Sequence, residues 1–189
     1  GSGHQTENLL ARMAGMSFGL VFLGVGISVM LLGLAFGILV GSPIEVGASR
    51  FFMRTREEST GMGELFWAFR QGQFWHIVLI MLVMKVKIFL WGLLFVIPGI
   101  VKSYEYRMVP YILAENPNLQ MSEVFALSRE MTMNQKMNIF VLDLSFIPWQ
   151  LLSGVTLGLA GIFWVNPYTR ATEAELYAVL RQNVLDSGF

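Results

Sequence analysis

The 189-residue chain is 54% hydrophobic and 14% charged, and its mean hydropathy of +0.58 is too high for an ordinary soluble domain. Thirteen basic residues balance thirteen acidic ones, so no strong overall field would draw the chain to nucleic acid. Cysteine is absent, which excludes disulfides, thiolate nucleophiles and cysteine metal ligands. These features predict a single membrane domain with no cofactor and no nucleic-acid partner.

Two long uncharged stretches carry the membrane signal. Thirty-two uncharged residues separate Arg12 from Glu45, and 26 separate Asp143 from Arg170. About 20 mostly apolar residues are enough to cross the hydrocarbon core. The first stretch is too long for a cleaved signal peptide, so we predict that it is retained. Residues 1–12, which begin GSGH, are expected to be a flexible N-terminus that includes a cloning remnant.

The first predicted hairpin covers residues 13–56. Its apolar part exceeds one span and falls short of two, so a tight turn near Leu31 to Gly33 fits if the second helix continues past Pro43. Small residues four apart let helices approach closely in lipid, although membrane helices also simply tolerate glycine. The glycines with this spacing are Gly15 with Gly19, and Gly33 with Gly37 and Gly41.

The second predicted hairpin covers residues 74–115. From residue 74 to residue 101 the chain is apolar except for Lys85 and Lys87. Pro98 lacks the amide donor that a continuing helix needs, and Gly99 permits a sharp turn. We therefore predict an outer turn at Pro98 and Gly99, followed by a short returning helix.

The third predicted hairpin covers residues 138–168, with a turn in the sequence TLGLAG, and a C-terminal amphipathic helix follows over residues 169–189. Three short segments share a glutamate six residues before an arginine, which either marks a repeated interfacial helix or reflects chance. These pairs are Glu64 with Arg70, Glu123 with Arg129, and Glu175 with Arg181. The fold predicted is an all-α integral membrane bundle of about six membrane segments in three hairpins, with interfacial amphipathic helices.

Basic residues predict the orientation of this bundle. Cytoplasmic loops hold an excess of Lys and Arg, and in the six-span arrangement most basic residues lie on one side. They are Arg12, Arg50, Arg54, Arg56, Arg70, Arg129, Lys136, Arg170 and Arg181. We therefore expect a multi-pass protein of the plasma membrane with both termini in the cytoplasm and Lys102 at an outer turn.

Several ordered blocks resemble a family of bacterial membrane proteins known as domain-of-unknown-function family 975. The blocks are LWGLLFVIPGIVKSYEYRMVPYILAENP (90–117), SREM (128–131), LDLSFIPW (142–149), TLGLAGIFWVNPY (156–168) and ATEAELY (171–177). The resemblance is specific over the last hundred residues and covers the first 70 only by general layout. The family is distantly similar to membrane domains attached to glycerophosphodiester phosphodiesterases, which carry no hydrolytic residues, so the resemblance implies a fold and a location but no reaction.

The chain departs from the family pattern at two places. Asn134 stands where the family usually has glycine, and Pro148 replaces a glycine in the SFIGW block. Asparagine can adopt the left-handed backbone conformation of a helix end, so we expect the turn at Asn134 to be retained.

Five ionisable residues fall within predicted membrane segments, where such residues are costly and often functional. They are Lys85, Lys87, Glu105, Arg107 and Asp143. Lys85 and Lys87 are two apart on a helix and point in different directions. Asp143 or Glu105 is expected to pair with one of these lysines, either to fix helix register or to line a polar cavity. Glu105 and Arg107 are alternatively anchors at the outer surface.

The sequence contains none of the usual ingredients of an active site, such as a nucleophile with its base or a phosphate loop. We therefore predict a non-enzymatic membrane module that binds membrane lipids, a second copy of itself or another membrane protein. The alternative is a small transporter or channel that uses the polar cluster.

Overall fold

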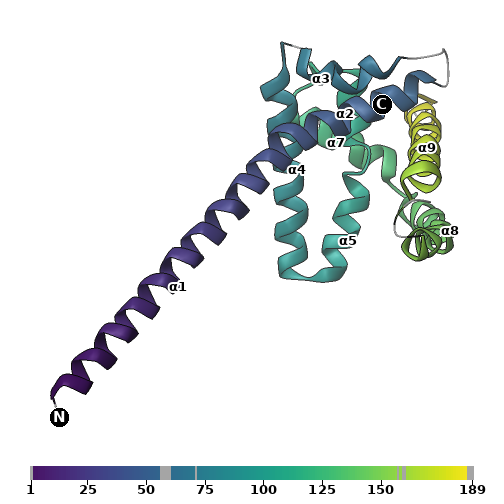
Figure 1. Ribbon diagram of the computed structural model, residues 1–189. Coiled ribbons are helices and arrows are strands. Elements are labelled where there is room, and N and C mark those ends of the chain that lie inside the picture. Colours follow the sequence, from purple (N-terminus) through teal and green to yellow (C-terminus); the bar gives the residue numbers. More distant parts are fainter. Residues whose placement is uncertain (1, 56–60, 71, 157, 159–160, 187–189) are drawn as a thin grey trace. The chain divides into compact units, whose positions relative to one another are not determined.

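The computed structural model describes residues 2–55, 61–70, 72–156, 158 and 161–186, with side chains described from residue 17 onward. Every regular element in this part of the chain is helical, which agrees with the predicted all-α class (Figure 1). The elements are α1 (Ser2–Phe36), η1 (Gly37–Gly41), α2 (Ser42–Thr55), η2 (Met62–Phe66), α3 (Trp67–Arg70), α4 (Phe74–Leu94), α5 (Val96–Glu105), α6 (Val109–Glu115), α7 (Met121–Thr132), α8 (Lys136–Val155), η3 (Gly161–Val165) and α9 (Asn166–Asp186).

The chain divides into two compact units, Gly1–Val40 and Gly41–Phe189. In the first unit, the turn expected near Leu31 to Gly33 does not occur, because α1 continues through these residues to Phe36. No proline interrupts this stretch, and a continuous helix satisfies every backbone N–H and C=O, as a bilayer requires. The backbone of residues 2–12, expected to be flexible, also belongs to α1.

Three helical segments are long and apolar enough to cross a membrane, namely Ser17–Thr55, Phe74–Leu94 and Lys136–Val155. The expectation of about six spans is therefore not supported. The returning segment of the second hairpin shows why. The 10 residues of α5 extend about 15 Å, at 1.5 Å per residue, whereas the hydrocarbon core is about 30 Å thick.

In the second unit, α4 and α5 form an antiparallel hairpin (Figure 1). Its turn is at Phe95, whose backbone is extended, and not at Pro98 and Gly99 as predicted. Pro98 instead lies in the first turn of α5. The N–H groups of a first turn have no acceptor within the helix, so the missing N–H of proline costs no hydrogen bond there. Gly99 has a different role: a Cβ at this position would lie 2.5 Å from the Cα of Gly92, so glycine lets the two helices touch.

The hydrophobic core surrounds α6, which is buried along nearly its whole length. The first half of α4 packs on it, together with parts of α2, α7 and α9. Its largest fully buried side chains include Tyr111, Ile77, Ile80, Met81, Met108, Ile112 and Leu113. Gly47 permits the close packing of α2 on η2, because a Cβ there would clash with the carbonyl oxygen of Leu65.

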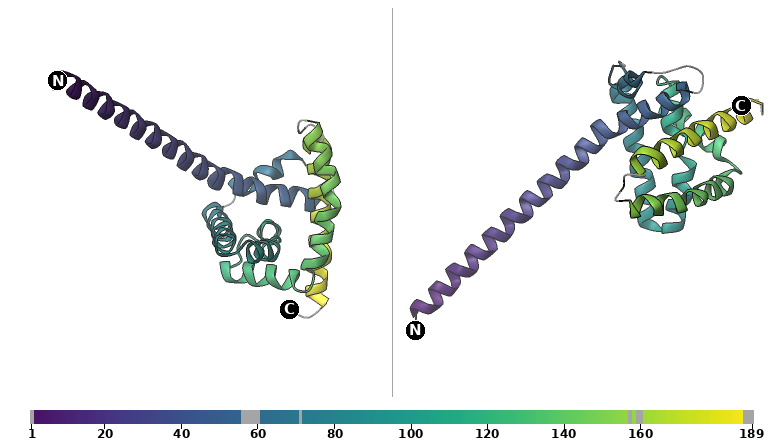
Figure 2. Two further views of the ribbon diagram at one scale, coloured as in Figure 1. Left: turned by 90° about the horizontal axis from the view of Figure 1, so that it is seen from below. Right: turned by 45° about the vertical axis from the view of Figure 1, so that its right-hand side comes forward.

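The α8 helix does not lie parallel to the α4–α5 hairpin. Figure 1 shows α4 and α5 lengthwise and α8 nearly end-on, and the left view of Figure 2 shows the reverse, so α8 runs across the hairpin axis. Asn134, just before α8, has a φ of 62°, which confirms the left-handed conformation predicted from the sequence.

After α8, Gly158 has a φ of +87° within the expected turn, of which residues 157 and 159–160 lie outside the described part. The C-terminal helix begins at Asn166, earlier than the expected residue 169, and its predicted end at 187–189 also lies outside that part. Arg56, counted above among the cytoplasmic basic residues, is likewise not described.

Candidate functional site: two ion-pair networks and a basic cavity

The first network is centred on Arg107, in the turn between α5 and α6. Its guanidinium donates two hydrogen bonds to Asp143 of α8, with Nη1 to Oδ2 at 2.6 Å and Nη2 to Oδ1 at 2.7 Å. Nη2 also lies 2.8 Å from Oε1 of Glu173 on α9. Such paired, charge-assisted hydrogen bonds are strong and directional, so Arg107 holds α8 and α9 to the α5–α6 junction.

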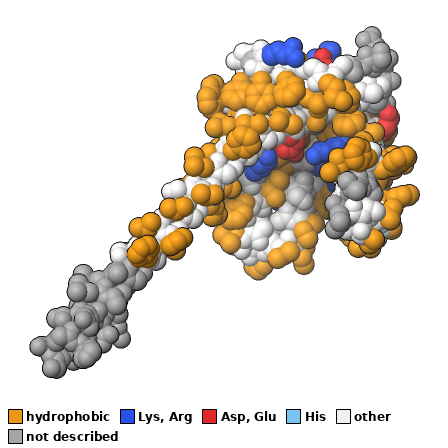
Figure 3. All heavy atoms as spheres, viewed as in Figure 1, with side chains coloured by type: hydrophobic (Ala, Val, Ile, Leu, Met, Phe, Trp, Pro, Cys, Tyr) orange, Lys and Arg blue, Asp and Glu red, His pale blue; other side chains and the backbone are white. Residues whose placement is uncertain are grey.

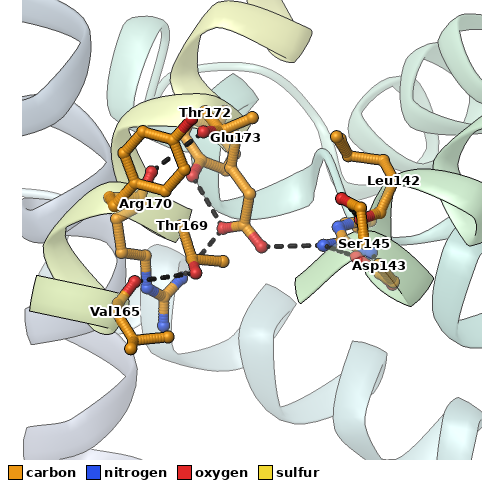
Figure 4. A network of polar contacts seen from close by, with 11 residues as sticks. Leu142, Asp143, Ser145, Val165, Thr169, Arg170, Thr172 and Glu173 are labelled. Atoms are coloured by element: carbon orange, nitrogen blue, oxygen red, sulfur yellow. Dashed lines mark hydrogen bonds and ion pairs between the residues drawn. The ribbon is translucent and has the colours of Figure 1, made fainter. Parts of the chain in front are cut away.

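Glu173 links this network to two further residues. The Tyr111 hydroxyl donates to its Oε2 at 3.0 Å, and Arg170 approaches the same oxygen at 3.4 Å. Figure 4 shows Glu173 facing toward Asp143 within this network. Burial raises the pKa of Tyr111 and the negative charge of Glu173 raises it further, so the phenol stays protonated and acts as a donor.

The second network surrounds Glu105, which is only 5% exposed. Its carboxylate lies 2.8 Å from Lys102 Nζ and 3.3 Å from Lys136 Nζ. Its backbone carbonyl accepts hydrogen bonds from the hydroxyls of Ser128 and Thr132 on α7. Burial alone would raise the pKa of Glu105, but the two lysines outweigh it and the pKa is lowered, so the group is ionised at neutral pH.

Lys85 and Lys87 face different elements, as their spacing predicted. Lys85 donates to Ser42 Oγ at 3.1 Å and lies 3.4 Å from Glu45, both on α2. The Lys87 ammonium lies 3.8 Å from the ring centroid of Phe125 on α7. This is a cation–π arrangement.

The five residues singled out in the sequence therefore do not form one cluster. Arg107 and Asp143 bind each other, Glu105 binds two other lysines, and Lys85 and Lys87 pair with neither Asp143 nor Glu105 in the described contacts. The prediction that Asp143 or Glu105 pairs with Lys85 or Lys87 was therefore wrong about the cations. The partners that the sequence argument missed are Lys102, Lys136 and Glu173.

A sequence signal for Glu173 did exist. It lies in ATEAELY, one of the blocks that carried the family resemblance, and it follows Arg170 by three residues, the spacing of a helical ion pair. Glu105 itself was identified, but its partner Lys102 was expected at an outer turn. Among the described residues, no buried side-chain nitrogen or oxygen lacks a hydrogen-bond partner.

A basic cavity of about 470 Å³ lies between α2, the end of α6 and α9. Its charged lining consists of Arg50, Arg54 and Arg181 with a single acid, Glu115. Arg181 Nη2 lies 2.7 Å from Glu115 Oε1, and Glu115 also accepts a hydrogen bond from the Tyr177 hydroxyl. The side chains of Arg54 and Arg181 are 53% and 46% exposed, so their remaining donors can reach a ligand.

An adjoining cavity of about 380 Å³ shares Glu115, Tyr177 and Arg181 with the basic one. The rest of its wall is almost entirely apolar and comes from α6, the loop between α6 and α7, α7 and α9. These residues are Ile112, Leu119, Leu127, Met131, Val184 and Leu185, with Asn116 as the polar exception. The basic cavity and the apolar cavity therefore meet at the Arg181–Glu115 pair.

Fold and site together define a helical protein with three segments able to cross a membrane and with ion pairs that join the region of Glu105 and Arg107 to α8 and α9. The family model described as "Protein of unknown function (DUF975)" matches residues 93–184, and this part of the chain belongs to that family. The matched stretch contains Arg107, Asp143 and Glu173, and therefore the whole first network. Neither a curated protein nor a solved structure matches the chain.

Proposed function

We propose that this chain is a non-enzymatic module of the bacterial plasma membrane that binds anionic lipid through the basic cavity. The observation that carries the proposal is the convergence of three arginines on a cavity that contains one carboxylate. Basic pockets at the membrane surface of helical proteins suit phosphate-bearing headgroups. The neighbouring apolar cavity offers a surface for part of an acyl chain.

The arrangement of Arg54 and Arg181 suits a phosphate group. Arginine presents its donors in a planar fork that matches phosphate oxygens, and both guanidinium groups are about half exposed. Glu64 accepts a hydrogen bond from Arg50 at 2.8 Å and one from Arg54 at 3.2 Å, but Arg50 is more firmly held because it also donates to the Ala114 carbonyl and stacks on Trp67. Arg50 therefore supplies fixed charge, while Arg54 and Arg181 supply the direct contacts.

Transport by the predicted polar cluster has less support. That function needs a continuous polar cavity lined by Lys85 or Lys87 and Asp143. The five cavities described here are lined by other residues. Asp143 is held by two hydrogen bonds from Arg107 and Lys85 by Ser42 and Glu45, which favours a structural role for these charges.

Native mass spectrometry of the purified protein in mild detergent tests the proposal. We expect phosphatidylglycerol to bind at least tenfold more tightly than phosphatidylcholine, and the double variant Arg54→Ala/Arg181→Ala to lose most of this preference. The matched control is Arg70→Ala/Arg129→Ala, which removes the same charge away from the cavity and should keep the preference. Equal binding of the two lipids by the wild type would refute the proposal.

A liposome flux assay separates the module from a transporter. The proposed module should leave ion and small-solute flux at the level of protein-free liposomes. Flux that is abolished by Asp143→Asn would favour the transporter instead. The C-terminus is proposed to lie in the cytoplasm, on the side that carries the arginine-rich helices α2 and α9. The continuous helix α1 has no turn that would bring the N-terminus back to that side.

A further inference from the structure

The end of the α4–α5 hairpin is a second membrane contact that is independent of the basic cavity. Residues 88–101, here called the hairpin tip, form a run of 14 uncharged residues on both sides of the turn at Phe95. Lys87 and Lys102 flank the hairpin tip, and their ammonium groups lie 5.7 and 5.6 Å from the ring centroid of Tyr106. The two lysines thus meet at one level and mark the base of the tip.

The hairpin tip has the length of one leaflet. Phe95 is eight residues after Lys87 and seven before Lys102, so the tip is about 11–12 Å deep at 1.5 Å per residue. A hydrocarbon core is about 30 Å thick, and apolar segments of 10–14 residues are typical of re-entrant or interfacial structure. If Phe95 reached the far surface, the bilayer interior would have to contain Lys87, Lys102 and Glu105.

Along α4, the exposure of the side chains increases close to Lys87, the last charged residue before the hairpin tip. Beyond Ile88, which still packs partly against the core, most side chains are exposed, with Phe95 66% and Ile97 75% exposed. By contrast, Ile80 and Met81 in the first half of α4 are fully buried in the core. Figure 3 shows hydrophobic side chains covering the end of the hairpin, with charged side chains above it. The protein therefore buries one face of the first half of α4 and leaves Trp75 and Leu79 exposed on the other, whereas the second half is exposed on most sides.

The exposed apolar side chains continue around the whole tip. Five consecutive residues are more than half exposed, namely Leu93, Leu94, Phe95, Val96 and Ile97. A helix that docks on a protein is apolar on one face, whereas a segment that is apolar all round is typical of insertion into lipid. The occupant indicated by these residues is the acyl-chain region of a bilayer.

We propose that the α4–α5 hairpin is a re-entrant element. Its tip enters one leaflet, ends near the bilayer midplane, and returns to the side from which it came. The Lys87, Lys102 and Glu105 groups then lie at headgroup level, where charged side chains cost little. Although α4 has the length of a membrane span, only its second half contacts lipid.

Depth measurements test this directly, because the chain has no native cysteine to interfere. Single variants Phe95→Cys and Ser103→Cys are labelled with a bimane fluorophore in phosphatidylglycerol-containing vesicles, and lipids brominated at different chain positions serve as quenchers. We expect bimane at Phe95→Cys to be quenched best by bromine near the chain ends, and bimane at Ser103→Cys by bromine near the headgroup. If Phe95→Cys does not fold, Ile97→Cys provides the same test.

A hairpin that crosses the bilayer would give the opposite order, with position 103 deeper than position 95. A tip that stays in water would show no quenching at either position. Either result overturns the proposal. Labelling with a membrane-impermeant maleimide shows from which side of the membrane each position is accessible. Ser103→Cys should react from the same side as Asn118→Cys, and reaction from opposite sides would also overturn the proposal.

Discussion

At the scale of single residues, the molecule depends on carboxylates that are held by more than one cation or donor. Glu173 receives contacts from Arg107, Tyr111 and Arg170, and Glu105 from Lys102 and Lys136. Each carboxylate joins at least two helices across the interior of the second unit. Replacing a residue that contacts two charged partners is therefore expected to reduce stability more than replacing a residue that contacts only one.

Arg107 provides the first test of this idea. Arg107→Gln removes the cation that lies between Asp143 and Glu173 and leaves Glu173 only the longer ion pair with Arg170; breaking a buried pair in this way costs about 3–5 kcal/mol. Because Asp143 is about a third exposed, we expect the lower part of that range and an apparent Tm about 5–10 °C lower. Differential scanning fluorimetry in mild detergent measures this change in apparent Tm.

The control for Arg107 is Asp143→Asn. This change keeps the Arg107–Glu173 pair and one hydrogen-bond acceptor at position 143, so we expect a loss of about 1 kcal/mol. Equal losses in the two variants would mean that Glu173 contributes nothing to the network.

Glu105 should make stability depend on pH in the acid range. Its pKa is lowered below the ordinary value of 4.5, so the folded state holds the ionised form more strongly than the unfolded state does. The stabilisation is complete above 4.5 and is lost as the pH falls through the lowered pKa, while Lys102 and Lys136 stay charged. Compared with Glu105→Gln, the wild type should have the higher Tm at pH 7, and the difference should shrink on acidification below 4.5. A difference that grows in acid would contradict this assignment.

The sequence was informative about which residues matter and less so about their partners. Arg107, Asp143 and Glu105 stood out because a charge in an apolar segment needs compensation. Apart from Lys102, which precedes Glu105 by three residues, their partners come from segments 31 to 66 residues away, and no local spacing encodes such distances. Asn134 was predicted correctly because a positive φ depends on the residue type itself.

At the scale of elements, the α4–α5 hairpin depends on one glycine and not on the proline beside it. Gly99→Ala places a methyl group against the backbone of Gly92, which has no flexible side chain to move away. Overpacking of this kind costs about 1–3 kcal/mol. We expect an apparent Tm about 3–8 °C lower in the same fluorimetric assay.

Gly92→Ala is the matched control, since a Cβ at that position meets nothing within 4 Å. Alanine also has the higher helix propensity by about 1 kcal/mol, so this variant should be as stable as the wild type or slightly more stable. Destabilisation of both variants by the same amount would show that the hairpin does not need close helix contact.

The displaced turn has a simple physical origin. A Pro-Gly pair in an apolar stretch indicates where a helix cannot continue, but proline is equally well accommodated in the first turn of the next helix. The chain uses the second option, so the break moves to Phe95 and Gly99 serves as a contact surface. The repeated Glu-to-Arg segments likewise serve unlike purposes: Glu64 binds Arg50, Glu123 caps α7, and Arg181 binds Glu115.

At the scale of the whole molecule, the hydropathy of the sequence correctly indicated helices able to cross a membrane, but it overestimated their number: about six were expected and three are found in the described part of the chain. Three hairpins were predicted because apolar stretches that exceed one span, or that contain turn residues such as Pro98 and Gly99, were divided into two membrane segments. Much of the apolar sequence is instead used internally: α6, residues Val109–Glu115, is buried by its neighbours. Hydropathy cannot distinguish a side chain that faces lipid from one that faces α6.

Among the residues whose side chains are described, the buried core lies entirely within the second unit, from Val46 to Val184. A chain of residues 41–189 should therefore fold without α1, with an apparent Tm within about 3 °C of the full chain, since none of these core residues is removed. A chain that ends before α9 should fail to fold, because it loses Tyr177 and Leu180 from the core and leaves Arg107 without Glu173. Circular dichroism and fluorimetry in mild detergent distinguish the two. If removing residues 1–40 abolished folding instead, α1 would have to be part of the core, and the division into two units would be wrong.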